Sequence, residues 1–274
     1  MKSLLSLGVP AVAGVALVLS GLLAPASETA GDPAAGSTSA VTPQTPAPEP
    51  DAGENPDAAG ANQGPAVDCA VLKCLALTFD DGPNEATTPR LLETLSREQV
   101  PATFFMQGAS IAVHPDTVRQ VADTPGMEIA THSATHPDLT GVTSERLTRE
   151  LVEPADQIEE VTGERPTLMR PPYGSENEAV REAAGVAGQA VILWSIDTLD
   201  WQTRDAAATA ETTLAEAEPG AIALMHDIHP STVDAVPEIV QGLKDEGYTL
   251  VTVSELLGQP EPGVAYTDAS EDPA

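Results

Sequence analysis

The sequence predicts an α/β fold, a (β/α) barrel that is incomplete and has about seven parallel strands. Apolar, β-rich segments alternate with segments of helical length between residues 75 and 257, which is typical of parallel strands joined by helices. No glycine-rich dinucleotide loop follows the first strand, so a barrel is favoured over an open sheet. Polar residues follow most strands, and we therefore expect an active site at the C-terminal ends of the strands.

The expected elements follow one another in a regular order. Strands are predicted at 75–79, 102–106, 127–130, 167–169, 190–196, 221–225 and 249–253, and helices at 88–99, 115–122, 144–162, 176–184, 205–217 and 232–246. Ser144 and Ser231, each with an acidic residue in the turn that follows, are typical of helix starts. Gly163 and Gly247 come just after two helices, where glycine accepts the left-handed conformation that ends them.

The chain divides into four regions by composition. Residues 1–26 are expected to be a signal peptide, because Lys2, an apolar stretch and the small residues of Ala24-Pro25-Ala26 follow in order. An uncleaved membrane anchor is the alternative, since the apolar run almost reaches the roughly 20 residues that span a bilayer. Residues 27–67 predict a disordered Ala/Pro/acidic linker, 68–258 the folded domain, and 259–274 an acidic disordered tail.

This organisation predicts a chain that leaves the cytoplasm. We expect it to be secreted or associated with the cell wall, with membrane contact only if the N-terminal segment stays uncleaved on the outer face of the cytoplasmic membrane. Cys69 and Cys74 lie just ahead of the first strand, and such a pair can close as a disulfide in an oxidising compartment. No second cysteine pair exists to complete a structural zinc site.

The charge of the chain excludes one class of partner. Its 42 acidic and 12 basic residues give a formal net charge of -30, which repels the phosphate backbones of nucleic acids and anionic lipid surfaces. We therefore expect no nucleic-acid ligand, and we expect a monomer.

Candidate functional residues stand where the predicted strands end. Asp80 and Asp81 follow the first strand, His132 the third, Arg170 the fourth, the segment 197–201 the fifth, and His226 the sixth. In a barrel these strand ends share one rim, so residues distant in sequence are expected to meet there. Taken singly, each could instead be a turn, a polar surface group or the start of a helix.

Two of these segments offer the ligands for a divalent metal. An aspartate pair at 80–81 and the imidazoles of His132 and His136 supply one carboxylate and two nitrogens and leave one aspartate free. The histidines are four residues apart, so one helical turn would place both rings on one face. A zinc ion with three protein ligands keeps a position for water, whose pKa falls from roughly 15.7 to about 7 to 9. This favours a hydrolase.

The same three ligands could also form the facial triad of a non-haem iron oxygenase. Such an enzyme has no use for an aspartate that is left free beside the metal, whereas a hydrolase can use it as a base. The free aspartate therefore argues against an oxygenase.

Five motifs together resemble the polysaccharide deacetylase family, the NodB-homology domain of carbohydrate esterase family four. They are TFDDGP at 78–83, HSATHP at 132–137, RPPYG at 170–174, DTLDW at 197–201 and LMHD at 224–227. The resemblance extends from about Leu75 to Leu257, and none of the motifs is broken.

The resemblance implies a role for each polar residue. Asp81, His132 and His136 would bind the metal, most often zinc (Zn²⁺), although Co²⁺ or another divalent ion is an alternative. Asp80 would be the general base, and Arg170 would orient it. His226 would be the general acid, with Asp200 as the carboxylate partner that keeps it charged.

Three further residues are expected to bind substrate. The backbone N–H of Tyr173 would stabilise the oxyanion, and Trp201 and Leu224 would line an apolar slot for the acetyl methyl group. His114 and His229 have no matched role, and both precede a proline near a helix start, so we assign them to structure.

The implied activity is hydrolysis of the acetamide of N-acetylglucosamine-type residues in an extracellular polysaccharide, peptidoglycan or chitin, with release of acetate. One alternative is an O-deacetylase of acetylxylan that uses the same site. Another is a glycan-binding cell-wall protein without activity, but replacement of the base, the acid or a ligand would then be expected, and all are present.

Overall fold

The computed structural model describes residues 67–269 of the chain. The predicted signal peptide or membrane anchor and the predicted linker up to residue 66 lie outside this range, as do residues 270–274. Within the described range, none of the helices combines the length and the apolar character that crossing a bilayer requires.

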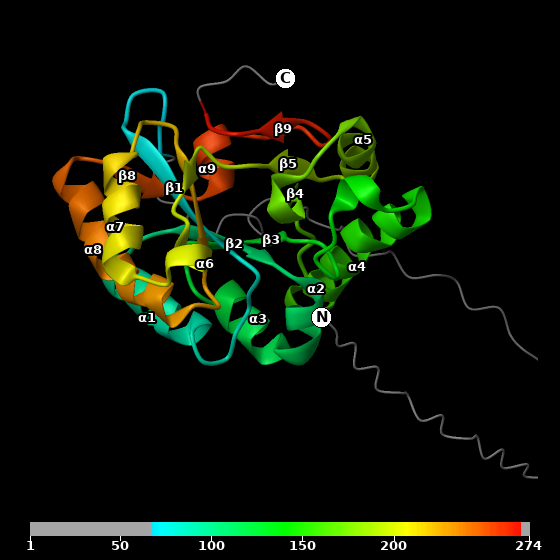
Figure 1. Ribbon diagram of the computed structural model, residues 1–274, viewed down its shortest axis with the longest axis horizontal. Helices are drawn as coiled ribbons and strands as arrows, with labels where there is room; N and C mark the ends of the chain where they lie inside the picture. The colour runs from blue at the N-terminus through cyan, green and yellow to red at the C-terminus, as the bar shows by residue number, and fades with distance from the viewer. Residues whose placement is uncertain (1–66, 270–274) are drawn as a thin grey trace, which may run out of the picture. The chain divides into compact units, whose positions relative to one another are not determined.

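The centre of the fold is one parallel sheet, shown in Figure 1. The described strands are β1 (Cys74–Asp80), β2 (Ala102–Met106), β3 (Met127–Thr131), β4 (Leu168–Met169), β5 (Ala190–Ile192), β6 (Ile196–Asp197), β7 (Ile222–His226), β8 (Thr249–Val251) and β9 (Ala265–Tyr266). Their order is β6-β7-β1-β2-β3-β4-β5-β9, and β8 pairs with the first half of β1. The strands at the two ends of this order, β6 and β9, do not pair with each other, so the sheet does not close. The prediction of an incomplete barrel is confirmed.

Helices follow the strands and surround the sheet (Figure 1). They are α1 (Thr88–Glu98), α2 (Gly108–Val113), α3 (Pro115–Ala122), α4 (Ser144–Thr162), α5 (Glu178–Val186), α6 (Asp200–Thr203), α7 (Ala206–Ala215), α8 (Pro230–Asp245) and α9 (Val253–Leu257), with 3₁₀ turns at Leu139–Gly141 and Pro172–Gly174. The predicted start of α8 at residue 232 is two residues late, because Pro230 is already helical and needs no N–H partner there.

The alternation of side chains along β1 decides which residues reach the inside of the barrel. Leu75, Leu77 and Phe79 belong to the core that the strands form with α1, α3 and α8. Their neighbours point to the opposite face, because successive side chains of a strand alternate. Asp80 therefore lies on the inner face of the sheet at the end of the strand.

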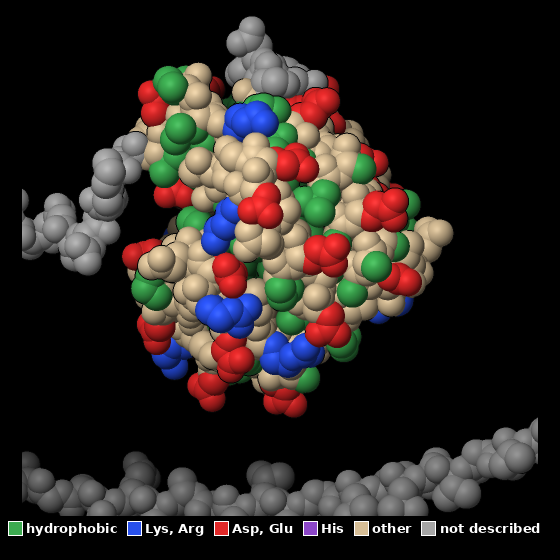
Figure 2. All heavy atoms as spheres, turned by 90° about the vertical axis from the view of Figure 1, so that its left-hand side faces the viewer, with side chains coloured by type: hydrophobic (Ala, Val, Ile, Leu, Met, Phe, Trp, Pro, Cys, Tyr) green, Lys and Arg blue, Asp and Glu red, His purple; other side chains and the backbone are tan. Residues whose placement is uncertain are grey.

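The acidic surface of the domain is visible in Figure 2, which looks onto the side where α1, α7 and α8 lie. Acidic side chains are spread over this face, and basic ones lie among them without forming a continuous patch. Arg90 of α1 pairs with Asp234 of α8 at 2.6 Å, so cations here have acidic neighbours. This face has no basic stripe that could follow a phosphate backbone.

The predicted strand at 190–196 is wrong in its middle. β5 ends at Ile192 and pairs with β4 and β9, whereas β6 begins at Ile196 and pairs with β7 at the other end of the sheet. Residues 193–195 therefore cross the open side of the barrel. The apolar composition of this segment hid the break. At the break, the buried Arg170 side chain donates to the carbonyls of Ile192 and Leu193.

The prediction of a disordered tail from residue 259 is wrong for residues 259–269. Val191 donates to the carbonyl of Val264 at 2.8 Å and Leu193 to that of Tyr266 at 2.8 Å, so β9 continues the sheet. Gly263 has a φ of 80°, and an added Cβ would lie 3.0 Å from the Arg181 carbonyl oxygen, so this turn requires glycine. The open edge of β5 orders a segment that is too short and acidic to reveal itself by composition.

Candidate active site

The predicted site residues meet at one end of the sheet. Asp80 is the last residue of β1 and His226 the last of β7, and the two lie side by side in the register of these strands. His132 follows β3 directly, and Arg170 follows β4. The expectation that these strand ends share one rim is confirmed.

A pocket of about 420 Å³ opens at this rim. It is lined by Asp80, Asp81, His132, His136, Tyr173, Trp194, Asp197, Trp201, Leu224 and His226. Arg170 and Asp200 are 0% and 1% exposed and lie beneath the lining residues. The two buried residues can therefore act only through the side chains that they hold.

Asp81, His132 and His136 form the one group among residues 67–269 that could hold a metal ion. Oδ1 of Asp81 lies 3.6 Å from Nε2 of His132 and 3.4 Å from Nε2 of His136, and the ligand atoms of all three lie within 4.8 Å of one another. One carboxylate oxygen and two imidazole nitrogens are donors that zinc accepts.

The surroundings of His132 fit this use. Its Nδ1 lies 2.8 Å from the backbone carbonyl of Arg170, so Nδ1 carries the proton and Nε2 keeps its lone pair toward Asp81. Burial lowers the pKa of His132 to about 3, which keeps the ring neutral, as a ligand must be. The residues present therefore fit a divalent metal.

The two histidines converge by a route that the sequence did not indicate. The segment after β3 is a loop rather than a helical turn, and Ser133 and His136 have φ angles of 60° and 59°. The hydroxyl of Ser133 accepts a hydrogen bond from the N–H of His136 at 2.9 Å. The rings meet edge to face at 4.9 Å, so the expectation of a helix was wrong while the convergence was right.

Arg170 holds Asp80 from inside the barrel. Its Nη1 donates to Oδ1 of Asp80 at 2.7 Å and to the hydroxyl of Thr78 at 2.7 Å, and its guanidinium lies 4.1 Å from the centre of the Phe105 ring. Burial raises the pKa of Asp80, and the charge and hydrogen bond of Arg170 oppose that rise only in part. A raised pKa suits a carboxylate that has to accept a proton near neutral pH.

Asp200 and His226 form a second buried pair. Oδ1 of Asp200 lies 2.8 Å from Nδ1 of His226, and Oδ2 accepts from the His226 N–H at 2.8 Å and the Thr232 hydroxyl at 2.6 Å. Burial disfavours the charged ring, but the hydrogen bond and charge of Asp200 outweigh it and raise the pKa of His226 to about 8. The imidazole is therefore charged at neutral pH and has a proton to give.

The predicted substrate-binding residues frame the opening of the pocket. Tyr173 and Trp201 are 69% and 47% exposed, although both are large and apolar in part, whereas Leu224 is buried at the base. The Tyr173 ring contacts that of His136 edge to face at 4.7 Å. Exposed aromatic rings beside a pocket offer flat apolar surfaces to a ligand.

Comparison with known proteins agrees with this arrangement. The family model for polysaccharide deacetylase matches residues 69–192. A chitooligosaccharide deacetylase of Rhizobium leguminosarum bv. trifolii is 36% identical over 188 residues, which cover 64% of this chain and 87% of that protein. The chain belongs to the polysaccharide deacetylase family.

Two further relatives extend the comparison. The peptidoglycan-N-acetylglucosamine deacetylase PgdA of Listeria monocytogenes is 40% identical over 200 residues, 73% of this chain and 42% of that protein, so the chain spans less than half of its length. A solved structure, "T48 deacetylase with substrate", superposes with a TM-score of 0.70 at 44% identity and covers 73% of this chain and 100% of that chain. The resemblance found in the five motifs is therefore confirmed at the level of the family.

Two residues line the pocket of this member of the polysaccharide deacetylase family without a role predicted from the sequence. Asp197 lies in the candidate segment 197–201, whereas Trp194 was missed. Trp194 was placed inside a continuous strand, although it stands just after the end of β5. An added Cβ on Gly174 would lie 2.9 Å from the Trp194 ring, so this ring packs against the backbone of the RPPYG segment. A break after Ile192 would have put Trp194 at a strand end, the signal used for the other residues.

Asp227 is a further residue that the sequence did not single out. It is fully buried, and its Oδ2 accepts a hydrogen bond from the hydroxyl of Thr88. A Cβ on Gly82 would lie only 2.3 Å from its Oδ1, which explains the glycine of the TFDDGP motif. Burial raises the pKa of Asp227 to about 7.

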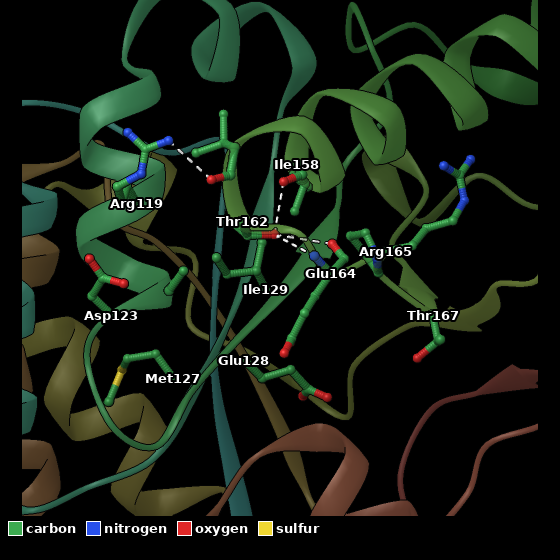
Figure 3. Close-up of a pocket in the computed structure, with 13 residues that line it drawn as sticks. Arg119, Asp123, Met127, Glu128, Ile129, Ile158, Thr162, Glu164, Arg165 and Thr167 are labelled. Atoms are coloured by element: carbon green, nitrogen blue, oxygen red, sulfur yellow. Dashed lines mark hydrogen bonds between the residues drawn. The ribbon is translucent and has the colours of Figure 1, made fainter. Parts of the chain in front are cut away.

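A larger cavity, of about 530 Å³, lies at the other end of β3. Figure 3 shows that Met127 and Ile129 of β3 line it together with Arg119 of α3 and Thr162 at the end of α4. The Thr162 hydroxyl is used by local backbone bonds to Ile158 and Glu164. None of the predicted site residues reaches this cavity, so the rim pocket remains the candidate site.

Proposed function

We propose that the protein is a metal-dependent N-deacetylase that hydrolyses the acetamide of N-acetylglucosamine-type residues in an extracellular polysaccharide, peptidoglycan or chitin, and releases acetate. The observation that carries the proposal is the meeting of a candidate base, a three-residue metal site and a charged acid around one pocket. Relatives described as deacetylases of peptidoglycan and of chitooligosaccharides support this substrate class.

The metal site consists of Asp81, His132 and His136, and zinc is the ion that suits it best, with Co²⁺ or another divalent ion as alternatives. A divalent ion there would supply Lewis acidity, which lowers the pKa of a water molecule and polarises a carbonyl oxygen. The protein's contribution is to aim both imidazoles at Asp81. Burial also keeps the His132 ring neutral, and its contact with the Arg170 carbonyl fixes which nitrogen carries the proton.

Asp80 is the general base in this proposal. Its Oδ1 is occupied by Arg170, and its Oδ2 lies 3.7 Å from Nε2 of His132, on the side of the predicted ligands. Oδ2 can therefore accept a proton from water as that water attacks the acetamide carbonyl. A positioned base of this kind contributes roughly 10² to 10⁴ in rate.

His226 is the general acid. Its Nδ1 faces Asp200, so Nε2 carries the proton that passes to the departing amine nitrogen when the C–N bond breaks. Asp200 keeps the ring charged and fixes its orientation. The backbone N–H of Tyr173, in a left-handed turn with a φ of 61°, would stabilise the negative charge on the former carbonyl oxygen.

Trp201 and Leu224 would line the slot that receives the acetyl methyl group, and the Tyr173 ring would contact the sugar. We further propose that the enzyme acts outside the cytoplasm, secreted or bound to the cell wall, as a monomer. The Cys69–Cys74 disulfide, with an S–S distance of 2.06 Å, is consistent with an oxidising location.

The test is acetate release by the purified chain from three substrates: chitin oligomers, peptidoglycan and acetylated xylan. We expect acetate from at least one of the first two, loss of activity with a chelator, and recovery with zinc or cobalt. The Asp80→Asn variant serves as the inactive control. Acetate from acetylxylan alone would favour the O-deacetylase, and tight glycan binding without acetate would favour an inactive binding protein.

A further inference from the structure

The turn that carries Trp201 and Asp200 cannot hold its shape alone. α6 is a single turn of four residues, Asp200–Thr203, and the residues on both sides, Leu199 and Arg204, have left-handed φ angles of 53° and 52°. An isolated helix of this length is unstable in water. Non-glycine residues in the left-handed region persist only where their surroundings fix them. Contacts with residues of other elements must therefore keep α6 in place.

One end of α6 is held by the acid pair. Asp200 bonds to His226 and to Thr232 of α8, as described above. Oδ1 of Asp200 also accepts from the Trp201 N–H at 2.8 Å. These bonds fix the start of the turn but do not reach the Trp201 carbonyl or its half-exposed side chain. A second set of contacts is needed for the Trp201 side of the turn.

Arg204 supplies that second set. Its Nε donates to the carbonyl of Trp201 at 2.7 Å, and its Nη1 lies 2.5 Å from Nδ1 of His229. A guanidinium offers only donors, so Nδ1 of His229 must be the acceptor, which makes this ring neutral with its proton on Nε2. Burial, and then the charge of Arg204, lower the pKa of His229, in agreement with this assignment.

His229 belongs to the loop that carries the proposed acid. Its N–H donates to the carbonyl of His226 at 3.3 Å, and the two rings lie 5.8 Å apart. It is the N-cap residue of α8, yet its side chain makes no capping bond. The ring is therefore available to Arg204, and the contact joins the Trp201 turn to the His226 loop.

We propose that Arg204 and His229 are a positioning pair that fixes the Trp201 side of the acyl slot, and that this pair sets the size of acyl group that the enzyme removes. The inference rests on the proposed function, because it takes Trp201 as a wall of that slot. Neither residue touches the reacting atoms. Their effect is to hold the half-exposed indole of Trp201 at a fixed distance from Leu224. An acyl group longer than acetyl would then clash with the ring.

The experiment compares N-acetyl with N-propionyl chitin oligomers by their ratio of kcat/KM. Arg204→Gln and His229→Leu should each lower the preference for acetyl about threefold to tenfold, with KM for the acetyl substrate raised more than kcat is lowered. His229→Asn should stay within about twofold of the parent, because the Asn Oδ1 can replace Nδ1 as acceptor and Asn is a good N-cap residue.

Arg90→Gln is the matched control, since it removes an arginine whose partner is the exposed Asp234 on α8. It should leave the acyl preference unchanged. The double variant Arg204→Gln/His229→Leu should lower the preference no further than Arg204→Gln alone, because His229→Leu removes only a contact that Arg204→Gln removes as well. Thermal unfolding of all variants should stay within about 4 °C of the parent.

Three outcomes would overturn the inference: an unchanged acyl preference in Arg204→Gln and His229→Leu, a preference that His229→Asn lowers as much as His229→Leu does, or additive effects in the double variant. A parent enzyme that releases no acid from either substrate would instead remove the proposed function itself, so the two failures are distinguishable.

Discussion

The two sides of the pocket are built in different ways. The base side, which we define as Asp80, Asp81, His132 and Arg170, stands on β1, β3 and β4 or directly after them. The acid side, defined as Asp200, Trp201 and His226, depends on one strand end and the single turn of α6. Strand pairing thus fixes the base side, whereas side-chain hydrogen bonds fix much of the acid side.

Burial varies within the acid side, because Asp200 is only 1% exposed. Arg170 and Asp80 are 0% and 2% exposed, whereas Trp201 is 47% exposed. A buried charge that loses its partner costs far more than an exposed contact that breaks. We therefore expect substitutions of the buried Arg170, Asp80 and Asp200 to affect folding as well as catalysis, and substitutions of Trp201 to affect catalysis alone.

The largest effect is expected from Arg170→Met. It leaves the Asp80 carboxylate buried without its cation, which should lower the free energy of unfolding by about 3 to 5 kcal/mol. The matched control is Arg90→Met, because the Arg90–Asp234 pair is half-exposed and such pairs contribute at most about 1 kcal/mol. Urea-induced unfolding of both variants measures the difference.

The double variant Arg170→Met/Asp80→Asn checks the physical reason for this cost. It removes both charges, so it should recover part of the lost stability. A double variant less stable than Arg170→Met would show that the lost packing of the guanidinium on Phe105, rather than the unpaired carboxylate, causes the loss.

The next effect is catalytic. Asp80→Asn should lower kcat roughly 10² to 10⁴-fold while bound metal stays at the parent level, because Asp80 is not one of the three clustered ligands. His132→Ala should lower both kcat and the amount of bound metal. Elemental analysis and acetate release, measured on the same preparations, separate the two cases. An Asp80→Asn variant nearly as fast as the parent would refute the assignment of the base.

Asp200→Asn tests the acid side through the pH profile. His226 must be protonated to act, and its pKa is raised to about 8, so kcat/KM should fall as the pH rises through about 8. Without the Asp200 charge the pKa of His226 falls, and the decline should begin at lower pH. At pH 8 we expect a loss of about 10- to 100-fold, measured as kcat/KM from pH 5.5 to 9.5.

A control for that profile is available on α1, away from the pocket. Arg90→Gln leaves the environment of His226 unchanged. Its kcat/KM should therefore fall at the same high pH as that of the parent. An Asp200→Asn profile with its decline at the same pH as the parent would mean that another group donates the proton.

The base side could be predicted from the sequence because its residues follow strands with clear apolar patterns. Asp80 is the last of the seven buried residues of β1, and Asp81 follows it. His132 follows a strand that pairs with β2 over its whole length. The rule that strand ends share a rim was therefore enough to bring these residues together.

Three other features could not be predicted, because they depend on contacts between distant segments. The break after Ile192 requires the buried guanidinium of Arg170, which lies 22 residues earlier. β9 requires the free edge of β5. His229 was assigned to structure on its neighbour Pro230, and its contact with Arg204 became visible only when α6 and the start of α8 were placed together.

The smallest catalytic effect is expected at the other end of β1. The disulfide joins Cys69 to Cys74, five residues apart, and Cys74 is the first residue of β1 whereas Asp80 is the last. Closing so short a loop stabilises a fold by about 2 kcal/mol, mainly by restricting the unfolded chain. Cys69→Ala/Cys74→Ala should therefore unfold at lower urea concentration and yet keep kcat/KM within about twofold of the parent at 25 °C. β1 is paired with β2 and β7 next to Asp80, so the base does not need the disulfide. A loss of activity well below the unfolding transition would contradict this and would show that strand pairing alone does not fix the base side.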